Sequence, residues 1–266
     1  MKYSKIKAAT VAIAKVDKNN PATFEIVGSG ACIDPKGIIL TCEHVISAFM
    51  AIPIQEQVKG YDQIAEPVEF DSPPFYVPYA IFYDVNPDGQ LLAYPSRVDQ
   101  MIAATDQDIG FVRVLDHPSF SNGYPSVDID EYDLVHEGLE IGTCGFPLGN
   151  FLQRQMGTVT SSFTFGSISS ISPFQGVKKE NLQTFQLDIT ATHGNSGGPV
   201  FNKENEKIIG VLQGGILHSS GTIQPGLVRC EPLYRIVEGE ELELLRELGP
   251  GEQVSPERLK KLKKKT

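Results

Sequence analysis

Residues 192–200 read Thr-His-Gly-Asn-Ser-Gly-Gly-Pro-Val and place one serine, Ser196, between glycines. Small neighbours leave its hydroxyl unshielded, and glycine allows the tight backbone turn that points successive N–H groups at one spot. Such a spot can hold the negative charge that develops on a carbonyl oxygen under nucleophilic attack. A plain glycine-rich loop is the alternative, because the chain contains 25 glycines. The motif therefore needs partners elsewhere in the chain.

A serine hydroxyl is a poor nucleophile at neutral pH and requires a base that is itself oriented by a third group. His44 follows the apolar run 38–42, and Asp108 opens the apolar run 108–114. Taken alone, a histidine at a strand end or an aspartate before a strand is usually structural. Together with Ser196 they predict a catalytic triad.

The order of these residues along the chain separates the two main architectures of serine hydrolases. The order here is His44, Asp108, Ser196, as in chymotrypsin-type enzymes, whereas α/β-hydrolases run Ser, Asp or Glu, His. No aspartate follows Ser196, and the only later histidine, His218, comes too soon for an intervening βα unit. The sequence excludes the α/β-hydrolase interpretation.

Short β-branched and aromatic runs separated by Gly, Pro, Asn and Asp recur along the chain, which predicts an all-β fold. The runs are separated by predicted turns such as Asp34-Pro35-Lys36-Gly37. This segment favours a turn because Pro presets φ and Gly allows the chain to reverse. The predicted strands are 8–16, 24–33, 38–42, 78–84, 90–95, 109–115, 139–145, 156–172 (bent or broken), 183–189, 198–202 and 207–213.

Charge and hydropathy exclude two classes of partner. The formal net charge is -10, and residues 255–266 carry six cations against one anion, which leaves about -15 for the remainder. That charge repels phosphate backbones, so we expect no nucleic-acid partner. No apolar run approaches the length of a membrane span.

The cysteines and the N-terminus bear on the cellular compartment. The run 8–14 is too short for a signal peptide, and its β-branched content favours a first strand. A hairpin at 34–37 would hold Cys32 and Cys42 roughly 10 Å apart, beyond bridging distance. We therefore expect reduced thiols, including those of Cys144 and Cys230, and a cytoplasmic location.

Several motifs together resemble the trypsin-like (chymotrypsin-fold) superfamily, and within it the HtrA/Deg branch. The resemblance covers roughly residues 8–215, and its specificity comes from the combination. The similar segments are Gly28-Ser29-Gly30, the runs around His44 and Asp108, Gly145-Phe146-Pro147-Leu148-Gly149, Thr158-Val159-Thr160-Ser161 and Gly194-Asn195-Ser196-Gly197-Gly198-Pro199.

The resemblance implies two Greek-key six-stranded β-barrels with the active site between them. The first, 1–125, would carry His44 and Asp108, and the second, 126–235, would carry Ser196. A short helical, lysine-rich tail, 236–266, would follow, with no PDZ-like domain. We expect no activation by cleavage at Ile26-Val27-Gly28, because it lies within a strand.

The resemblance also implies the role of each site residue. Ser196 would attack the peptide carbonyl, His44 would carry the proton, and Asp108 would orient the imidazole. Gly194 and Ser196 would supply the oxyanion N–H groups. Asp106 is the weaker candidate for the acid, because Asp108 better matches the family pattern.

By the same resemblance, five residues would contact substrate. Their side chains include no acid, which favours small or medium uncharged side chains at the position before the cleaved bond (P1). Asp188 is interpreted as structural. The expected substrate-binding residues are Thr190, His193, Leu212, Gln213 and Gly214.

The segment 51–77, with four prolines and no clear periodicity, is interpreted as a surface insertion on the first barrel. Residues 242–248 and those after Ser255 are predicted to be helical. The sequence does not predict an oligomeric state.

Three other functions remain open at this point. The fold could serve as a catalytically silent binding module, or the triad could act as an esterase or an acyl transferase. A protein or peptide substrate is expected, with no cofactor. We also expect no metal site, because His117, His136 and His218 show no ligand spacing with cysteines or carboxylates.

Overall fold

The computed structural model describes most of the chain. It covers residues 2–17, 24–49, 76–103, 107–130, 135–156, 159–176, 178, 181–217, 223–232 and 246. The predicted insertion (except 76–77), Asp106, His218 and the predicted C-terminal helices (except Arg246) lie outside these residues.

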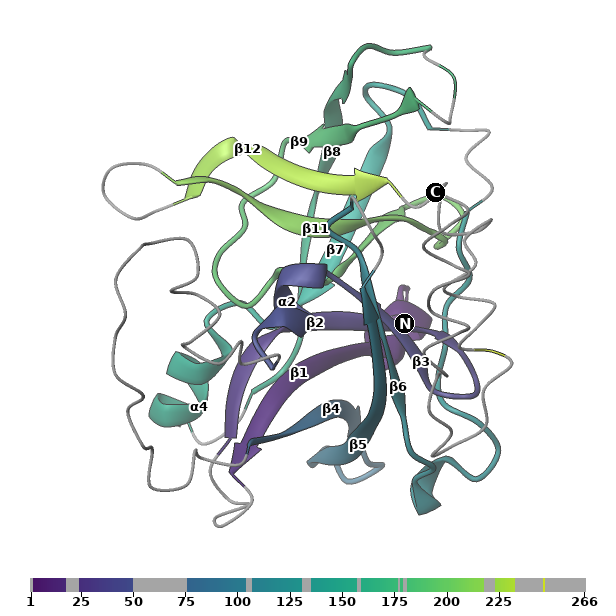
Figure 1. Cartoon of the computed structure of the whole chain (residues 1–266), viewed down its shortest axis with the longest axis vertical. Coiled ribbons are helices and arrows are strands. Elements are labelled where there is room, and N and C mark those ends of the chain that lie inside the picture. The colour runs from purple at the N-terminus through teal and green to yellow at the C-terminus, as the bar shows by residue number, and fades with distance from the viewer. Residues whose placement is uncertain are drawn as a thin grey trace, which may run out of the picture.

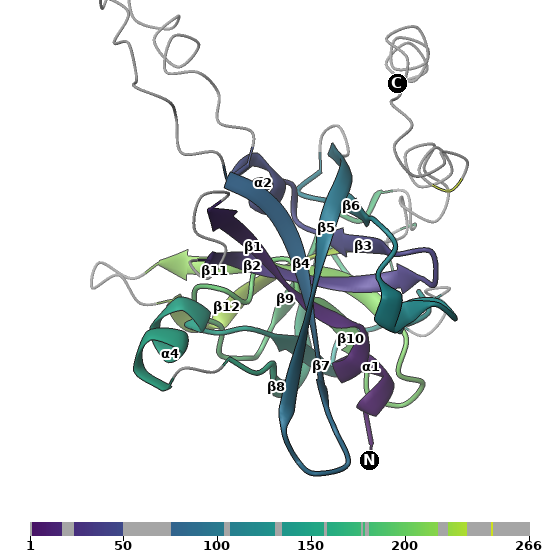
Figure 2. The same ribbon diagram turned by 90° about the horizontal axis from the view of Figure 1, so that it is seen from below.

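Twelve strands form two closed six-stranded barrels, which confirms the predicted fold class. Figure 1 shows one barrel above the other, and Figure 2 views the first barrel from below. The strand orders are β1-β2-β3-β6-β5-β4 and β7-β8-β9-β12-β11-β10, so both barrels repeat one pattern. Closure pairs both edges of every strand and leaves no free sheet edge.

The first barrel comprises β1 (Thr10–Asp17), β2 (Phe24–Asp34), β3 (Ile38–Thr41), β4 (Tyr76–Val85), β5 (Leu91–Ala103) and β6 (Gly110–Val114). The second comprises β7 (Glu140–Gly145), β8 (Ser162–Ser172), β9 (Thr184–Leu187), β10 (Pro199–Asn202), β11 (Ile208–Leu217) and β12 (Ile223–Pro232). The helical elements are α1 (Ser4–Ala9), α2 (Glu43–Ser47), the 3-10 turn η2 (Pro118–Phe120) and α4 (Gly149–Met156).

The strands that lead to the site are the most deeply buried. Every residue of β3, β6 and β10 is buried. Strands with both faces covered read as continuous apolar runs, which is why sequence located them well. One apolar cluster runs through both barrels. The loops that leave these strands therefore start from rigid positions.

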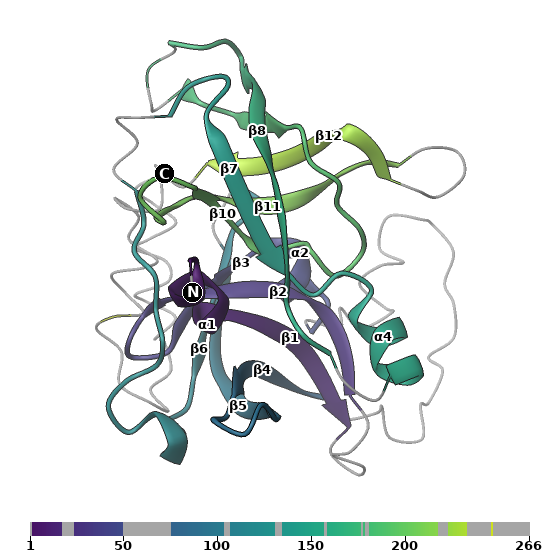
Figure 3. The same ribbon diagram turned by 180° about the vertical axis from the view of Figure 1, so that it is seen from behind.

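The segment between the barrels contacts both of them. Val127 donates its N–H to the Cys32 carbonyl at 3.0 Å, and Asp130 donates to the Ile208 carbonyl at 2.8 Å. The N-terminus makes a second connection, because the Tyr3 ring packs near Phe163, Phe165 and Phe201 of the second barrel. Figure 3 shows α1 at the junction of the barrels. The barrels are thus held together on more than one side.

Within the described residues, the sequence pattern did not predict helices α1, α2 and α4 or strand β12. The predicted strand 8–16 starts only at Thr10, because Ile6 and Ala9 are buried on α1 and the Thr10 hydroxyl bonds the Ile6 carbonyl at 2.8 Å. The predicted run 156–172 contains the end of α4, and its strand starts at Ser162. β12 escaped prediction because Pro225, Gly226 and charged residues interrupt its apolar pattern.

All four cysteines are free, as predicted, and all four are buried. Among the described residues, no helix combines the length and the apolar character needed to cross a membrane.

Candidate active site

His44 stands on α2, the short helix that follows β3. Cys42, at the N-cap, is extended, and the chain turns into the helix directly after it. Val45 and Ile46 are buried beneath the helix, so the opposite face carries the imidazole outward. The apolar strand and these two side chains explain why this sequence presents a histidine at the junction of the barrels (Figure 1).

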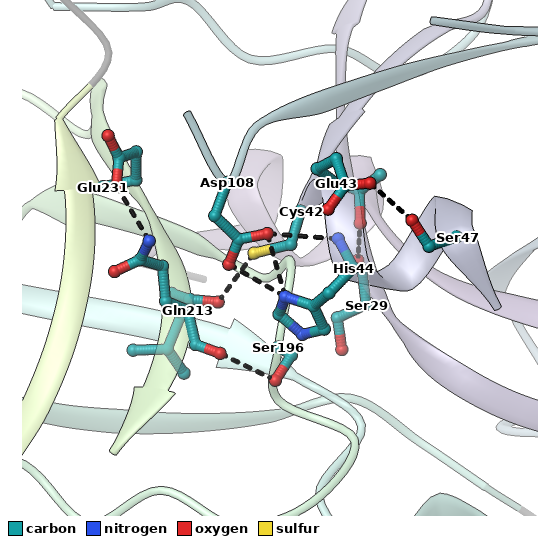
Figure 4. A network of polar contacts seen from close by, with 11 residues as sticks. Ser29, Cys42, Glu43, His44, Ser47, Asp108, Ser196, Gln213 and Glu231 are labelled. Atoms are coloured by element: carbon teal, nitrogen blue, oxygen red, sulfur yellow. Dashed lines mark hydrogen bonds and ion pairs between the residues drawn. The ribbon is translucent and has the colours of Figure 1, made fainter. Parts of the chain in front are cut away.

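Asp108 lies two residues before β6, the strand that pairs with β3. Its carboxylate oxygens lie 2.8 and 2.9 Å from His44 Nδ1, and the His44 backbone N–H donates to Oδ1 at 3.1 Å. The His44 side chain is 47% exposed and that of Asp108 is 24% exposed. The carboxylate thus fixes both the ring and its backbone, and within the described residues the far ring nitrogen makes no hydrogen bond (Figure 4).

The pKa of His44 is raised above its ordinary value. The hydrogen bond to Asp108 is the largest cause, partial burial opposes it, and the charges of Asp108 and Glu43 add to the increase. A raised pKa makes the imidazole a stronger base, because the carboxylate stabilises the protonated ring.

Ser196 lies in the loop between β9 and β10, on the second barrel. The loop is anchored to the first barrel through Ser29 of β2. The Ser29 N–H donates to the Ser196 carbonyl at 2.8 Å, and its hydroxyl donates to the Gly194 carbonyl at 2.6 Å. The Ser29 hydroxyl also accepts the Phe146 N–H at 3.0 Å. One buried serine therefore connects the nucleophile loop, β2 and the end of β7.

The backbone around Ser196 has the hydrogen-bond pattern of an oxyanion hole. The N–H groups of Gly194 and Ser196 have no acceptor within the described ranges, although those of Asn195, Gly197 and Gly198 do. The His193 carbonyl accepts the Leu148 N–H at 2.8 Å. Because the C=O and N–H of a trans peptide point in opposite directions, this bond turns the Gly194 N–H the other way.

Gly194 is required where the loop passes the end of β7. Its φ is +96°, and a Cβ there would lie 2.2 Å from the Phe146 carbonyl oxygen. No side chain fits, because the obstructing atom is backbone.

The Ser196 hydroxyl donates to the Gln213 carbonyl at 3.0 Å. Figure 4 marks this bond and draws no hydrogen bond between Ser196 and the His44 ring. The Cβ position of Gly28 lies 2.9 Å from the Ser196 carbonyl oxygen and 2.7 Å from Val45, the residue after His44. The serine loop therefore reaches the junction where His44 and Asp108 lie, with its hydroxyl directed at the wall strand β11.

The predicted substrate-binding residues lie in different environments. Thr190 and His193 are exposed, and Gln213 and Gly214 are partly buried on β11. The Leu212 side chain is fully buried, and its carbonyl already accepts the Gly197 N–H at 2.8 Å. Leu212 can therefore contribute neither a side chain nor a free carbonyl to substrate. Asp188 is exposed directly after β9.

Sequence reasoning missed several neighbours of the site. The carboxylate of Glu231 on β12 accepts the Gln213 side-chain N–H at 2.8 Å, so an acid does stand beside the predicted wall. Glu231 lies opposite β11 on β12. The sequence pattern did not reveal that strand, so it did not indicate this neighbour. Ser29 lay within a quoted motif, but no local feature indicated a contact across 165 residues.

Cys42 is the other missed neighbour. Its thiol donates to the Leu212 carbonyl at 3.3 Å. Burial raises the pKa of this thiol well above its ordinary value, and the charge of Asp108 adds to the increase. Ligand atoms of Cys42, His44 and Asp108 all lie within 4.8 Å of one another, the geometry of a possible metal-binding group. The spacing Cys42-Glu43-His44 was the available signal.

Trypsin-like peptidase domains consist of two Greek-key barrels, one with a histidine–carboxylate pair and the other with a glycine-flanked serine. This structure has the same arrangement. The model of that family matches residues 28–211. The chain belongs to the family of trypsin-like peptidase domains.

Individual relatives place it near the HtrA/Deg branch, as the motifs predicted. The chain is 28% identical over 201 residues to the "Probable periplasmic serine endoprotease DegP-like" of Rickettsia prowazekii (strain Madrid E). The match covers 75% of this chain but only 29% of that relative.

Solved structures share the fold at low identity. Deg5 has a TM-score of 0.57 at 16% identity, with 93% of this chain and 94% of Deg5 covered. The HtrA-type protease AlgW, solved with a decapeptide, has a TM-score of 0.57 at 16% identity, with 98% and 74% covered.

The predicted cytoplasmic location is wrong by this comparison, because the curated relative is a periplasmic protein by name. The prediction depended on reading residues 8–16 as a strand and on unpaired thiols. The strand is present from Thr10 onward and the thiols are free, but buried thiols can stay reduced in an oxidising compartment because reagents cannot reach them.

Proposed function

We propose that this chain is a serine endopeptidase in which Ser196 is the nucleophile, His44 the general base and Asp108 the orienting acid. The carrying observation is the position of the His44 ring. Its Nδ1 bonds the Asp108 carboxylate at 2.8 Å, and the Ser196 loop is held against the same barrel by the bond from the Ser29 N–H to the Ser196 carbonyl at 2.8 Å. This geometry leaves Nε2 able to accept the serine proton.

Peptide hydrolysis would proceed through an acyl-enzyme ester. Ser196 Oγ bonds to the scissile carbonyl carbon as its proton passes to His44 Nε2 and the C=O π bond opens, and the resulting oxyanion accepts hydrogen bonds from the N–H groups of Gly194 and Ser196. The C–N bond then breaks as His44 returns that proton to the leaving amine. Water hydrolyses the resulting ester through the same base, which restores the free hydroxyl.

The Ser196 hydroxyl must leave the Gln213 carbonyl before it can react. A rotation about one side-chain bond accomplishes this, because serine changes between staggered positions readily. An extended substrate that pairs with β11 would offer its own N–H groups to carbonyls of that strand. Substrate binding would thus favour release of the hydroxyl toward His44.

For specificity we propose small or medium uncharged P1 side chains. Thr190 and His193 carry no negative charge at neutral pH, and the Gln213 amide already bonds the nearby Glu231 carboxylate. A peptide library with every residue at P1 tests this. Preferred cleavage after Arg or Lys would refute it.

We also propose that the protein acts in the periplasm or an equivalent envelope compartment, as the name of its Rickettsia relative suggests. Cell fractionation tests this, and recovery of the native protein only with cytoplasmic markers would contradict it.

The triad predicts that Ser196→Ala lowers peptide turnover by about 10⁶-fold. The measurement is hydrolysis of a quenched peptide together with labelling by a fluorophosphonate probe, which requires an activated serine. Ser169→Ala is the matched control, because Ser169 is exposed on β8 and, among the residues that the structure describes, its hydroxyl donates to the Gln186 carbonyl alone.

Labelling and turnover should disappear in the first variant and persist in the control. An unreactive wild type would favour the silent binding module, and turnover of esters without peptides would favour the esterase.

A further inference from the structure

The thiol of Cys42 lies close to the paired side chains of His44 and Asp108. The Sγ atom of Cys42, an oxygen of Asp108 and a nitrogen of His44 lie within 4.8 Å of one another. Among the described residues, no other group of three such side chains comes this close. The nitrogen that faces Asp108 is Nδ1, at 2.8 Å from Oδ2.

These three ligand types match the preferences of Zn²⁺. Zinc binds Cys sulfur at about 2.3 Å and His nitrogen or carboxylate oxygen at about 2.0–2.2 Å, usually in a tetrahedron. Such bond lengths place neighbouring ligand atoms roughly 3.2–3.6 Å apart. Small adjustments therefore suffice: Nδ1 and the carboxylate separate slightly, and the thiol moves slightly inward.

Charge also favours a divalent cation at this point. The ion would displace the Cys42 thiol proton to solvent and shift the His44 Nδ1 proton to Nε2, so the thiolate and the Asp108 carboxylate balance its two positive charges and Nε2 can no longer accept a proton. Cysteine binds such ions as the thiolate, so binding releases the thiol proton. The His44 side chain is 47% exposed and that of Asp108 24%, whereas Cys42 is fully buried, so an ion must enter from the side of the histidine–carboxylate pair.

We propose that Cys42, His44 and Asp108 form an inhibitory site for Zn²⁺ or a similar thiophilic divalent cation. Water would complete the tetrahedron as the fourth ligand. Occupancy breaks the hydrogen bond that orients His44 and fixes the ring on the metal, so the base no longer serves Ser196. The inhibition rests on the proposed peptidase function, whereas binding of the ion does not.

The site discriminates by ligand softness. Thiolate and imidazole favour Zn²⁺, Cd²⁺ and Co²⁺ over Mg²⁺ and Ca²⁺, which prefer all-oxygen shells. Millimolar Mg²⁺ or Ca²⁺ should leave the site empty.

Binding is tested first in the Ser196→Ala protein, where catalysis is absent. Co²⁺ is the probe, because a cobalt–thiolate bond gives a near-ultraviolet charge-transfer band that surface histidines cannot produce. We expect one thiolate-bound Co²⁺ per chain, displaced by Zn²⁺. Adding Cys42→Ala or Cys42→Ser should abolish the band, and adding His44→Ala should weaken Co²⁺ affinity at least about tenfold.

Cys144→Ala is the matched control, because Cys144 is another buried free cysteine outside the group. It should keep the band. Circular dichroism of each variant confirms that loss of the band is not loss of the fold, and the Ser variant preserves the shape of the site if the Ala variant unfolds. No thiolate band in Ser196→Ala, or a band that survives Cys42→Ser, would overturn the site.

Inhibition is tested in the active protein. Zn²⁺ should reduce peptide turnover and a chelator should restore it, with the inhibition constant raised at least about tenfold in Cys42→Ser relative to that variant's own metal-free rate. Equal sensitivity of wild type and Cys42→Ser would refute an inhibitory role. A protein that binds Co²⁺ through Cys42 but never cleaves peptides would refute the proposed function and leave the site standing.

Discussion

At the scale of single residues, the site depends on the pairing of His44 with Asp108. Two short contacts to the ring nitrogen and one to the backbone N–H hold the carboxylate against the histidine. The sequence predicted both members and their pairing, because apolar strands before and after them mark where each side chain must emerge. It could not predict Cys42 as a third neighbour, since the direction of a side chain at a strand-to-helix turn depends on how the turn packs.

The pH dependence of activity follows from this pair. The pKa of His44 is raised, chiefly by its bond to Asp108, so the ring stays protonated to higher pH than a free imidazole. Because the base must be neutral to accept a proton, activity should fall as pH decreases through a midpoint above about 6.5. The measurement is kcat/KM against pH.

Asp108→Asn supplies the comparison. It should lower the rate by about 10⁴-fold and move the residual acid limb downward, because the amide no longer stabilises the charged ring. An acid limb that stays in place in Asp108→Asn would show that another group controls it.

At the scale of elements, the end of β7 and the start of α4 shape the loop that carries Ser196. The Leu148 N–H holds the His193 carbonyl at 2.8 Å, and the Phe146 carbonyl passes directly beside Gly194. The sequence predicted β7 closely but not α4. That helix spans only eight residues, too few for a clear periodic signal, and Asn150 ties it to the first barrel by bonding the Ile26 backbone at 2.6 and 2.8 Å.

Gly194→Ala should therefore reduce kcat by at least about 10²-fold, because the new Cβ would meet the Phe146 carbonyl and displace one oxyanion N–H. Gly176→Ala is the matched control. Gly176 also has a positive φ, +82°, but nothing lies within 4 Å of its Cβ position. Both variants should lose about 1–2 kcal/mol of stability from backbone strain.

Only Gly194→Ala should lose activity. Equal kcat values for the two variants, compared at equal folded fraction, would exclude Gly194 from the oxyanion hole.

At the scale of the whole molecule, the active site exists only because the two barrels meet. Ser29 of the first barrel bonds the backbone of the Ser196 loop and receives the Phe146 N–H of the second barrel. The Thr41 hydroxyl in turn fixes the Ser29 carbonyl at 2.7 Å. The Tyr3 contacts at the N-terminus reinforce the same junction.

Ser29→Ala should destabilise the protein by about 1–3 kcal/mol, because it leaves the buried Phe146 N–H without its acceptor. It should also lower kcat, since the Gly194 carbonyl loses its donor. The measurements are denaturant unfolding and peptide hydrolysis. Ser169→Ala, which removes an exposed hydrogen bond within the second barrel, should change neither by a comparable amount. Unchanged unfolding in Ser29→Ala would show that this contact does not hold the barrels together.

The sequence by itself determined the all-β class, most strands and the three residues of the predicted triad. Strand periodicity, turn residues and a glycine-flanked serine are local signals, and local signals are legible in a linear chain. Only the tertiary structure decided that Ser29 supports the nucleophile loop, that Glu231 stands beside Gln213 and that Cys42 lies against the triad. Those contacts join segments far apart in the chain, and they arise from barrel closure and from the docking of one barrel on the other, which no local pattern records.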